Sequence, residues 1–171
     1  MTVRIPRQFA RMYIEVGPAD VEGLEITLSP GLDLTGVLRV EGQAQIDPAA
    51  IRLFLEPAVR QPFFGGGMSE VKSDGSLKIA SVMPETYRVR VFGGTVPMYV
   101  KSVSLGDQIA KDNQITVLPG VAPVLNVVVS TAAGQIGGAI KNDKDEPVRG
   151  ATVVLLPEGA KREQNDLVKF S

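Results

Sequence analysis

The stretch that decides the fold is SDGSLKIASVMPETYRVRV, which occupies residues 73–91. It contains two runs in which apolar and polar residues alternate, one over residues 77–79 and one over residues 87–91. The pair Asp74-Gly75 precedes the first run, and Pro84 separates the two runs. Alternation with a period of two is typical of half-buried strands, while Asp-Gly and Pro favour turns. The stretch therefore predicts a turn, a strand, a second turn and a second strand.

The same alternation recurs along most of the chain, and no window shows an apolar stripe at helical spacing. The chain also contains 18 Gly and 12 Pro, which are frequent in turns. Short strands at regular intervals with many turns predict an all-β protein, an antiparallel Greek-key-like β-sandwich. Further strands are expected at residues 24–28, 32–40, 51–55, 96–100, 115–117 and 125–129, and a polar loop is expected at residues 157–166.

Composition excludes several classes of function. The 18 Lys and Arg nearly balance the 19 Asp and Glu, and there is no long run of like charge, so nucleic acid and anionic lipid are not expected as partners. No apolar run is long enough to cross a membrane. The absence of His and Cys removes the commonest general base, the best zinc ligands and thiol nucleophiles. We therefore expect no enzyme, no catalytic residue, no metal and no cofactor.

The chain also resembles itself. A shift of 101 residues places five residues on identical ones and two on similar ones. The pairs are Ile14 with Ile115, Val16 with Val117, Pro18 with Pro119, Leu24 with Leu125, Ile26 with Val127, Leu28 with Val129 and Ser29 with Ser130. With one further residue inserted, residues 34–38 match residues 136–140. Two unrelated meanders would share the alternation, but they would not share the Pro and Gly positions, so the match predicts a tandem repeat.

The repeat predicts three parts. Residues 1–28 are expected to be the closing strands of an upstream repeat or an N-terminal arm, and residues 29–130 a complete β-sandwich repeat. Residues 131–171 are expected to open a downstream repeat that stops early. Strands without their sheet leave backbone groups unpaired. We therefore expect a protein partner, including a second copy of the chain, to pair with these edges.

Residues 134–157 read GQIGGAIKNDKDEPVRGATVVLLP. This stretch resembles the opening of carboxypeptidase regulatory-like domains, which are grouped with transthyretin-like and collagen-adhesin B-type sandwiches. In that pattern a Gly-bearing strand, a polar turn and a Pro-Val-x-Gly-Ala-x-Val strand follow one another. Residues 73–91 resemble its second half, although Glu85 replaces the Gly that usually follows the Pro. The resemblance implies a sandwich of this type with partial neighbouring repeats at both ends, in a bacterial exported protein that is extracellular, at the cell surface or periplasmic.

Several residues are candidates for fold or contact roles. The expected determinants of turns and strand order are Asp74, Gly75, Pro84, Tyr87, Pro147 and Gly150. The Tyr87 hydroxyl is expected to reach the backbone at the sandwich edge, with ligand stacking as the alternative. The expected partner contacts are Phe63, Phe64 and Met68, since adjacent aromatics on a strand face opposite ways; filling of the core is the alternative. The acidic residues Asp143, Asp145 and Glu146 lack calcium-loop spacing, so no metal site is expected there.

The leading functional prediction is a non-catalytic structural or interaction module in a tandem β-sandwich array. Such a module serves as a spacer, adhesin stalk or assembly subunit, and it is able to associate with itself by strand complementation. The alternative is a carbohydrate- or peptide-binding module that uses loop aromatics. Glycan is the weaker prediction, because the chain has no Trp and only 3 Tyr and 6 Phe.

Overall fold

The computed structural model describes residues 8–12, 14–59, 67–134, 136–159 and 169–170. The chain forms two compact units, Met1–Ala133 and Gly134–Ser171. Strands account for nearly all of the regular secondary structure, and the described residues contain no α-helix. The predicted all-β class is confirmed.

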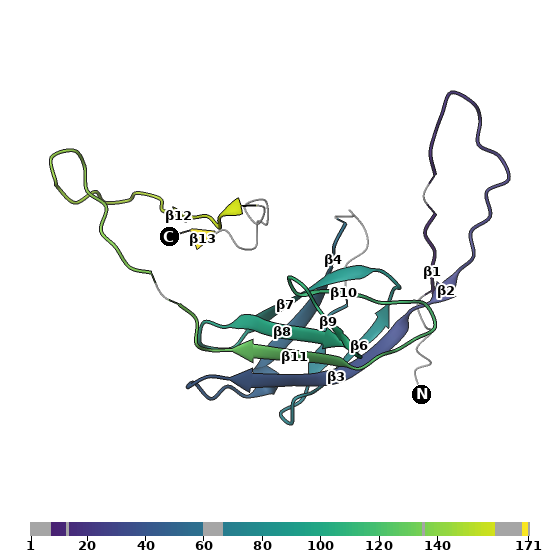
Figure 1. Ribbon diagram of the computed structural model, residues 1–171, viewed down its shortest axis with the longest axis horizontal. Coiled ribbons are helices and arrows are strands. Elements are labelled where there is room, and N and C mark those ends of the chain that lie inside the picture. Colours follow the sequence, from purple (N-terminus) through teal and green to yellow (C-terminus); the bar gives the residue numbers. More distant parts are fainter. Residues whose placement is uncertain (1–7, 13, 60–66, 135, 160–168, 171) are drawn as a thin grey trace, which may run out of the picture. The chain divides into compact units, whose positions relative to one another are not determined.

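The first unit contains a six-stranded sheet with the strand order β5-β6-β3-β11-β8-β9 (Figure 1). Its strands are β3 (Leu32–Glu41), β5 (Glu70–Val71), β6 (Ser76–Val82), β8 (Tyr99–Leu105), β9 (Gln108–Ile109) and β11 (Leu125–Ser130). All neighbouring strands are antiparallel except β3 and β11, which run parallel. The predicted antiparallel sandwich is therefore corrected at one place, where two strands far apart in sequence meet at the centre of the sheet.

The second sheet of this unit has three antiparallel strands in the order β10-β7-β4. They are β4 (Ile51–Pro57), β7 (Thr86–Gly93) and β10 (Gln114–Thr116). A short 3-10 helix, η1 (Pro48–Ala50), leads into β4, and the Asp47 carboxylate caps it by accepting a hydrogen bond from the Ala49 amide at 2.9 Å. The two sheets form the layers of a β-sandwich.

The core is built by alternate residues of the strands of both sheets. In β4 the side chains of Ile51, Leu53 and Leu55 are completely buried, while Arg52 between them is exposed. This is the alternation that a strand requires when one face packs on a core and the other faces solvent. The remaining core side chains are Leu34, Leu38, Val71, Leu77, Ile79, Val82, Tyr87, Val89, Val103, Leu105, Ile115, Val117, Leu125, Val127 and Val129.

Two short strand pairs lie outside these sheets. In the first unit, β1 (Gln8–Phe9) pairs with β2 (Ser29–Pro30) in antiparallel fashion. In the second unit, β12 (Val154–Leu155) pairs with β13 (Lys169–Phe170). The second unit also contains a tight turn, in which the Asn142 side-chain oxygen accepts hydrogen bonds from two backbone amides at 2.9 Å.

Two strand predictions are wrong, the one at residues 24–28 and the one that the repeat implies for residues 136–140, and a third strand begins later than predicted. Residues 24–28 and 136–140 have no strand structure, although their apolar residues alternate. No described strand pairs with either segment, and alternation produces a strand only where a partner strand satisfies the backbone. The strand expected at residues 96–100 begins only at Tyr99, because Pro97 has no amide to donate to a ladder.

Gly36 allows the two parallel strands to pair. It lies opposite Leu125 in the register of β3 and β11. A Cβ atom at position 36 would collide with the backbone carbonyl oxygen of Leu125. Because that oxygen belongs to the backbone of a central strand, it has no rotamer by which to move away. A residue without a side chain is therefore required at this contact.

We predict that Gly36→Ala lowers the free energy of unfolding by about 3 kcal/mol, because the added methyl group forces the central strands apart. Urea denaturation of the whole chain measures this change. The control is Gly134→Ala, since a Cβ at position 134 meets no atom within 4 Å. We expect that variant to change stability by less than about 0.5 kcal/mol. Equal stability of the two variants would contradict the prediction.

Candidate interaction surface

The predicted turn residues Asp74 and Gly75 lie between β5 and β6. The Asp74 carboxylate accepts a hydrogen bond from the Ser76 amide at 2.8 Å, and hydrogen bonding to Ser76 lowers the pKa of this carboxyl. Gly75 has a φ of 82°, a conformation that favours glycine. Its carbonyl oxygen accepts a hydrogen bond from the Leu38 amide at 2.8 Å. The turn is thereby attached to β3, which places these two residues in the framework of the larger sheet.

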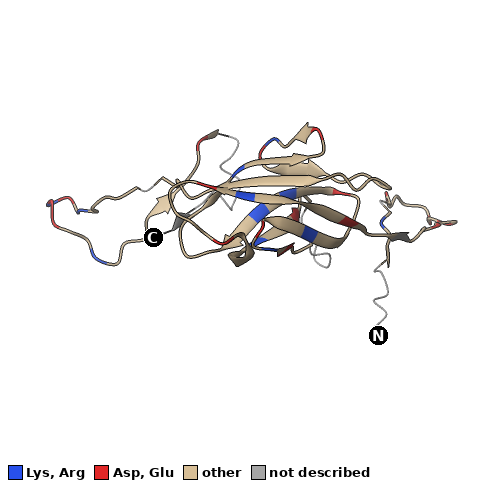
Figure 2. Ribbon diagram, turned by 90° about the horizontal axis from the view of Figure 1, so that it is seen from below, with Lys and Arg blue, Asp and Glu red and all other residues tan. Residues whose placement is uncertain are grey.

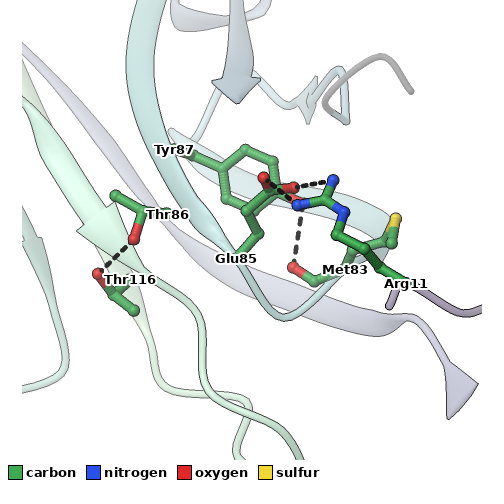
Figure 3. A network of polar contacts seen from close by, with 6 residues as sticks. All are labelled: Arg11, Met83, Glu85, Thr86, Tyr87 and Thr116. Atoms are coloured by element: carbon green, nitrogen blue, oxygen red, sulfur yellow. Dashed lines mark hydrogen bonds and ion pairs between the residues drawn. The ribbon is translucent and has the colours of Figure 1, made fainter. Parts of the chain in front are cut away.

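Pro84 lies in the turn that joins β6 to β7, and Tyr87 follows it as the second residue of β7. The Tyr87 side chain is buried, and its hydroxyl donates a hydrogen bond to the Met83 carbonyl oxygen at 3.0 Å (Figure 3). On the same turn, Glu85 receives two hydrogen bonds from the Arg11 guanidinium, at 2.7 and 3.2 Å. This ion pair connects the N-terminal segment to the sandwich edge. Next to it, the Thr86 and Thr116 hydroxyls lie 3.0 Å apart and join β7 to β10.

Sequence reasoning missed the ion pair of Arg11 with Glu85. The two residues are 74 positions apart, so no local pattern relates them. One signal was present, because Glu85 stands where the resembling pattern has Gly. Both partners are largely shielded from solvent, with 24% of the Arg11 side chain and 11% of the Glu85 side chain exposed. A carboxylate in this position can hold a guanidinium against the turn, which a glycine cannot do.

Burial raises the pKa of Tyr87 to about 12, and the negative charge of Glu85 adds to the shift. Between pH 10 and pH 12 the unfolded chain releases this proton and the folded chain keeps it. The stabilisation is therefore present in full below pH 10 and is lost as the pH rises through about 12.

We predict that Tyr87→Phe lowers the free energy of unfolding by about 1 kcal/mol at neutral pH, because the hydrogen bond to Met83 is lost. The variant also loses less stability than the parent chain between pH 10 and pH 12, since it has no hydroxyl to titrate at this position. Urea denaturation across this pH range measures both effects. Tyr99→Phe is the control, because Tyr99 is exposed. A pH response equal to that of the parent chain would contradict the prediction.

Two of the predicted contact residues, Phe63 and Phe64, lie outside the described residues. The third, Met68, is 58% exposed and forms an isolated β-bridge with Phe54 of β4. The Phe54 ring packs against that of Phe92 in β7, with centroids 6.3 Å apart. The aromatic pair of Phe54 and Phe92 thus lies on the strands next to the exposed Met68, and it consists of residues other than the predicted Phe63 and Phe64.

Two arginines alternate with these rings on the outer side of the three-stranded sheet. In the strand register Arg52 lies opposite Phe92, and Phe54 lies opposite Arg90. We call these four residues the Arg/Phe face. The Arg52 guanidinium donates to the Ala49 carbonyl oxygen at 2.6 Å, and the Arg90 guanidinium contacts Glu56 at 2.6 Å. Both cations are thus held in place by the chain itself, and the rings between them can stack on a ligand.

The acidic residues of the second unit are engaged in a turn. The Lys141 ammonium contacts the Asp145 carboxylate at 2.8 Å, and the Asn142 side-chain amide donates a hydrogen bond to the Glu146 carboxylate at 2.9 Å. Pro147 forms an isolated bridge with Lys141 at the base of this turn. Gly150 follows with a φ of 73°. Over the described ranges, no group of three or more acidic side chains is arranged to hold a metal ion.

Charged residues of both signs are interspersed on the strands of the sandwich (Figure 2). The exposed large apolar residues instead concentrate in two segments, residues 14–28 and residues 136–156. Within the part of the chain that the structure describes, no helix has the length and apolarity needed to span a bilayer. The surface therefore carries two exposed apolar segments and the Arg/Phe face. It has no large patch made of one sign of charge among the described residues.

Comparison of the chain with protein-family models, with curated proteins and with solved structures gave no match. The carboxypeptidase regulatory-like resemblance thus stays a prediction from the two motifs.

Proposed function

We propose that this chain is a non-catalytic structural module, one link of a tandem array of Greek-key, carboxypeptidase regulatory-like sandwiches. In such an array the module acts as a spacer, stalk or assembly subunit. The motifs that resemble this family support an exported bacterial setting, at the cell surface or in the periplasm. The observation that carries the proposal is the parallel pairing of β3 with β11.

The parallel pair places the entry and exit of the chain at opposite ends of one ladder. The chain enters the sandwich at Leu32, the first residue of β3, and leaves it after Ser130, the last residue of β11. The two strands are in register from Leu125 opposite Gly36 to Ser130 opposite Glu41. Tension along the chain therefore pulls one strand past the other in shear. In shear all hydrogen bonds of the ladder are loaded together, whereas peeling breaks them one after another.

The flanking strands support the same role. β6 covers the other edge of β3, and β8 covers the other edge of β11, so both loaded strands lie inside the sheet. Their inward side chains belong to the common core. Moving one strand along the other thus disturbs hydrogen bonds and core packing at the same time. A link that transmits force or holds a fixed spacing requires this coupling.

We predict that the sandwich resists force strongly when the whole chain is pulled from its two termini. The rupture should release residues 32–130 in one step and lengthen the chain by about 30 nm. In a control, one handle is kept at the N-terminus and the other is attached at Ala122→Cys. The chain has no other Cys, so the attachment is unique.

The control handle lies just before β11 and therefore pulls the neighbouring starts of the two parallel strands apart. We expect a severalfold lower rupture force in this peeling geometry than in the shearing geometry. Single-molecule force spectroscopy measures both. Equal forces in the two geometries, or gradual extension without a rupture, would contradict a link that transmits force.

The second candidate function is binding of a carbohydrate or an extended peptide at the Arg/Phe face. It is favoured by the contact of Phe54 with the partly exposed Phe92 ring, and by the fixed guanidinium groups on either side. Aromatic and guanidinium planes both stack on sugars or peptide side chains.

For this candidate we predict that Phe92→Ala abolishes any binding found in calorimetric titration with a broad panel of glycans and peptides. Ile109→Ala is the control, because Ile109 is exposed on the edge strand of the other sheet. Binding that survives Phe92→Ala would remove this face as the site.

A further inference from the structure

Two segments of the chain carry the apolar pattern of core strands but have no strand to pair with among the described residues. In residues 24–28 the side chains of Leu24, Ile26 and Leu28 are all exposed. In residues 136–140 the same is true of Ile136 and Ile140. We call the first the donor segment and the second the acceptor segment. Exposed alternating apolar residues are unfavourable in water unless another strand covers them.

The donor segment has a buried counterpart within the same chain. A shift of 101 residues places Leu24 on Leu125, and it places the following apolar residues on those of β11. Leu24 is 49% exposed, whereas Leu125 is fully buried at the centre of the six-stranded sheet. The same pattern of residues is therefore solvent-exposed in one place and a central core strand in the other.

The acceptor segment has its counterpart in β3. A shift of 102 residues places Leu34 and Leu38 on Ile136 and Ile140. Leu34 is fully buried, whereas Ile136 is 79% exposed. The acceptor segment is thus a copy of β3 that lacks its neighbour.

Gly138 indicates which kind of strand the acceptor segment would receive as its neighbour. Gly36 and Gly138 occupy the same position in the two segments. At Gly36 a Cβ would collide with the backbone of β11, which explains why no side chain is tolerated. At Gly138 a Cβ would meet no atom within 4 Å. A glycine at position 138 leaves room for a closely approaching parallel strand, and no strand among the described residues lies there.

We propose that the donor segment of one copy of this chain pairs in parallel with the acceptor segment of a second copy. The register follows from that of β11 on β3, in which Leu125 lies opposite Gly36 and Val127 lies opposite Leu38. Transferred to the two segments, it places Leu24 opposite Gly138 and Ile26 opposite Ile140. This inference rests on the proposed function and deepens it, since it names the partner and the contact that joins one link to the next.

The geometry of the sandwich favours a second copy as the occupant. The donor segment precedes the start of β3, and the acceptor segment follows the end of β11. Because β3 and β11 are parallel, the chain enters and leaves the sandwich at opposite ends of the ladder. A contact between two unlike segments is heterologous, and such contacts continue from copy to copy unless a rotation closes them into a ring. The expected product is a head-to-tail series.

The test uses two variants of the whole chain that block one side each. Ile26→Asp puts a charge on the buried side of the donor strand, and Gly138→Val fills the space that the donor backbone needs. Both positions lie outside the packed core of the sandwich, so both variants should fold. A urea denaturation curve equal to that of the parent chain would show that each variant still folds.

We expect the parent chain to form a series of species whose average mass rises with concentration in analytical ultracentrifugation. Each variant by itself should remain monomeric at every concentration. An equal mixture of the two variants should form a species of two chains and no larger one, because one unblocked donor meets one unblocked acceptor. This outcome distinguishes strand complementation from general association of apolar surfaces.

The matched controls lie one residue away. Gly137→Thr places a side chain where the equivalent residue of β3 is Thr35, which the sandwich accommodates. Thr27→Asp adds the same charge as Ile26→Asp to the opposite side of the donor strand. Both control variants should associate as the parent chain does. Loss of association in the controls together with the blocked variants would overturn the proposed register.

Hydrogen exchange gives the second measurement. We expect backbone amides of residues 24–28 and 138–141 to gain protection as concentration rises, and to lose it in the blocked variants. A single chain at every concentration would overturn the proposal, whether or not these amides are protected. High resistance to shear with no association would remove this inference alone, because the shear measurement depends on residues 32–130. Association without that resistance would instead contradict the proposed role in transmitting force.

Discussion

The parallel contact between β3 and β11 is the constraint on which the rest of the sandwich depends. It brings together residues about ninety positions apart, and it joins a sheet whose other strand pairs are antiparallel. The contact exists because Gly36 presents no side chain to the Leu125 carbonyl oxygen. With β11 in place, β8 and β9 extend the sheet on one side, while β6 and β5 extend it on the other. Removing this contact would divide the larger layer into two separate parts.

Local pattern predicted most of the layers. The alternation in residues 51–55, 77–79, 87–91 and 125–129 identified strands and their buried faces, because burial of every second side chain is a property of each strand by itself. The Asp74-Gly75 turn could be predicted for the same reason. Parallel pairing could not be predicted, since it depends on which distant strand lies beside β3. The donor segment shows the reverse case. Its alternation predicted a strand, but no described strand lies beside it, so it forms none.

The candidate surfaces were predicted less completely. The hydrogen bond of the Tyr87 hydroxyl to the backbone was expected from a tyrosine at a sandwich edge. The Arg11 contact with Glu85 was not expected, because it joins segments that no repeat or motif relates. The Arg/Phe face likewise depends on the register of β4 against β7, which sequence alone does not give. What could be predicted was therefore local in sequence, and what could not was created by pairing between strands.

The position of β11 also has a consequence for synthesis. It is the last long strand of the sandwich in sequence, yet it occupies the middle of the larger sheet. While the ribosome makes the chain, β3 emerges early and must wait with one edge open until β11 follows. Contacts between such distant residues slow folding, and open edges in the meantime are prone to pair with other chains. A nascent chain of this protein is therefore most vulnerable to aggregation just before its final core strand leaves the exit tunnel.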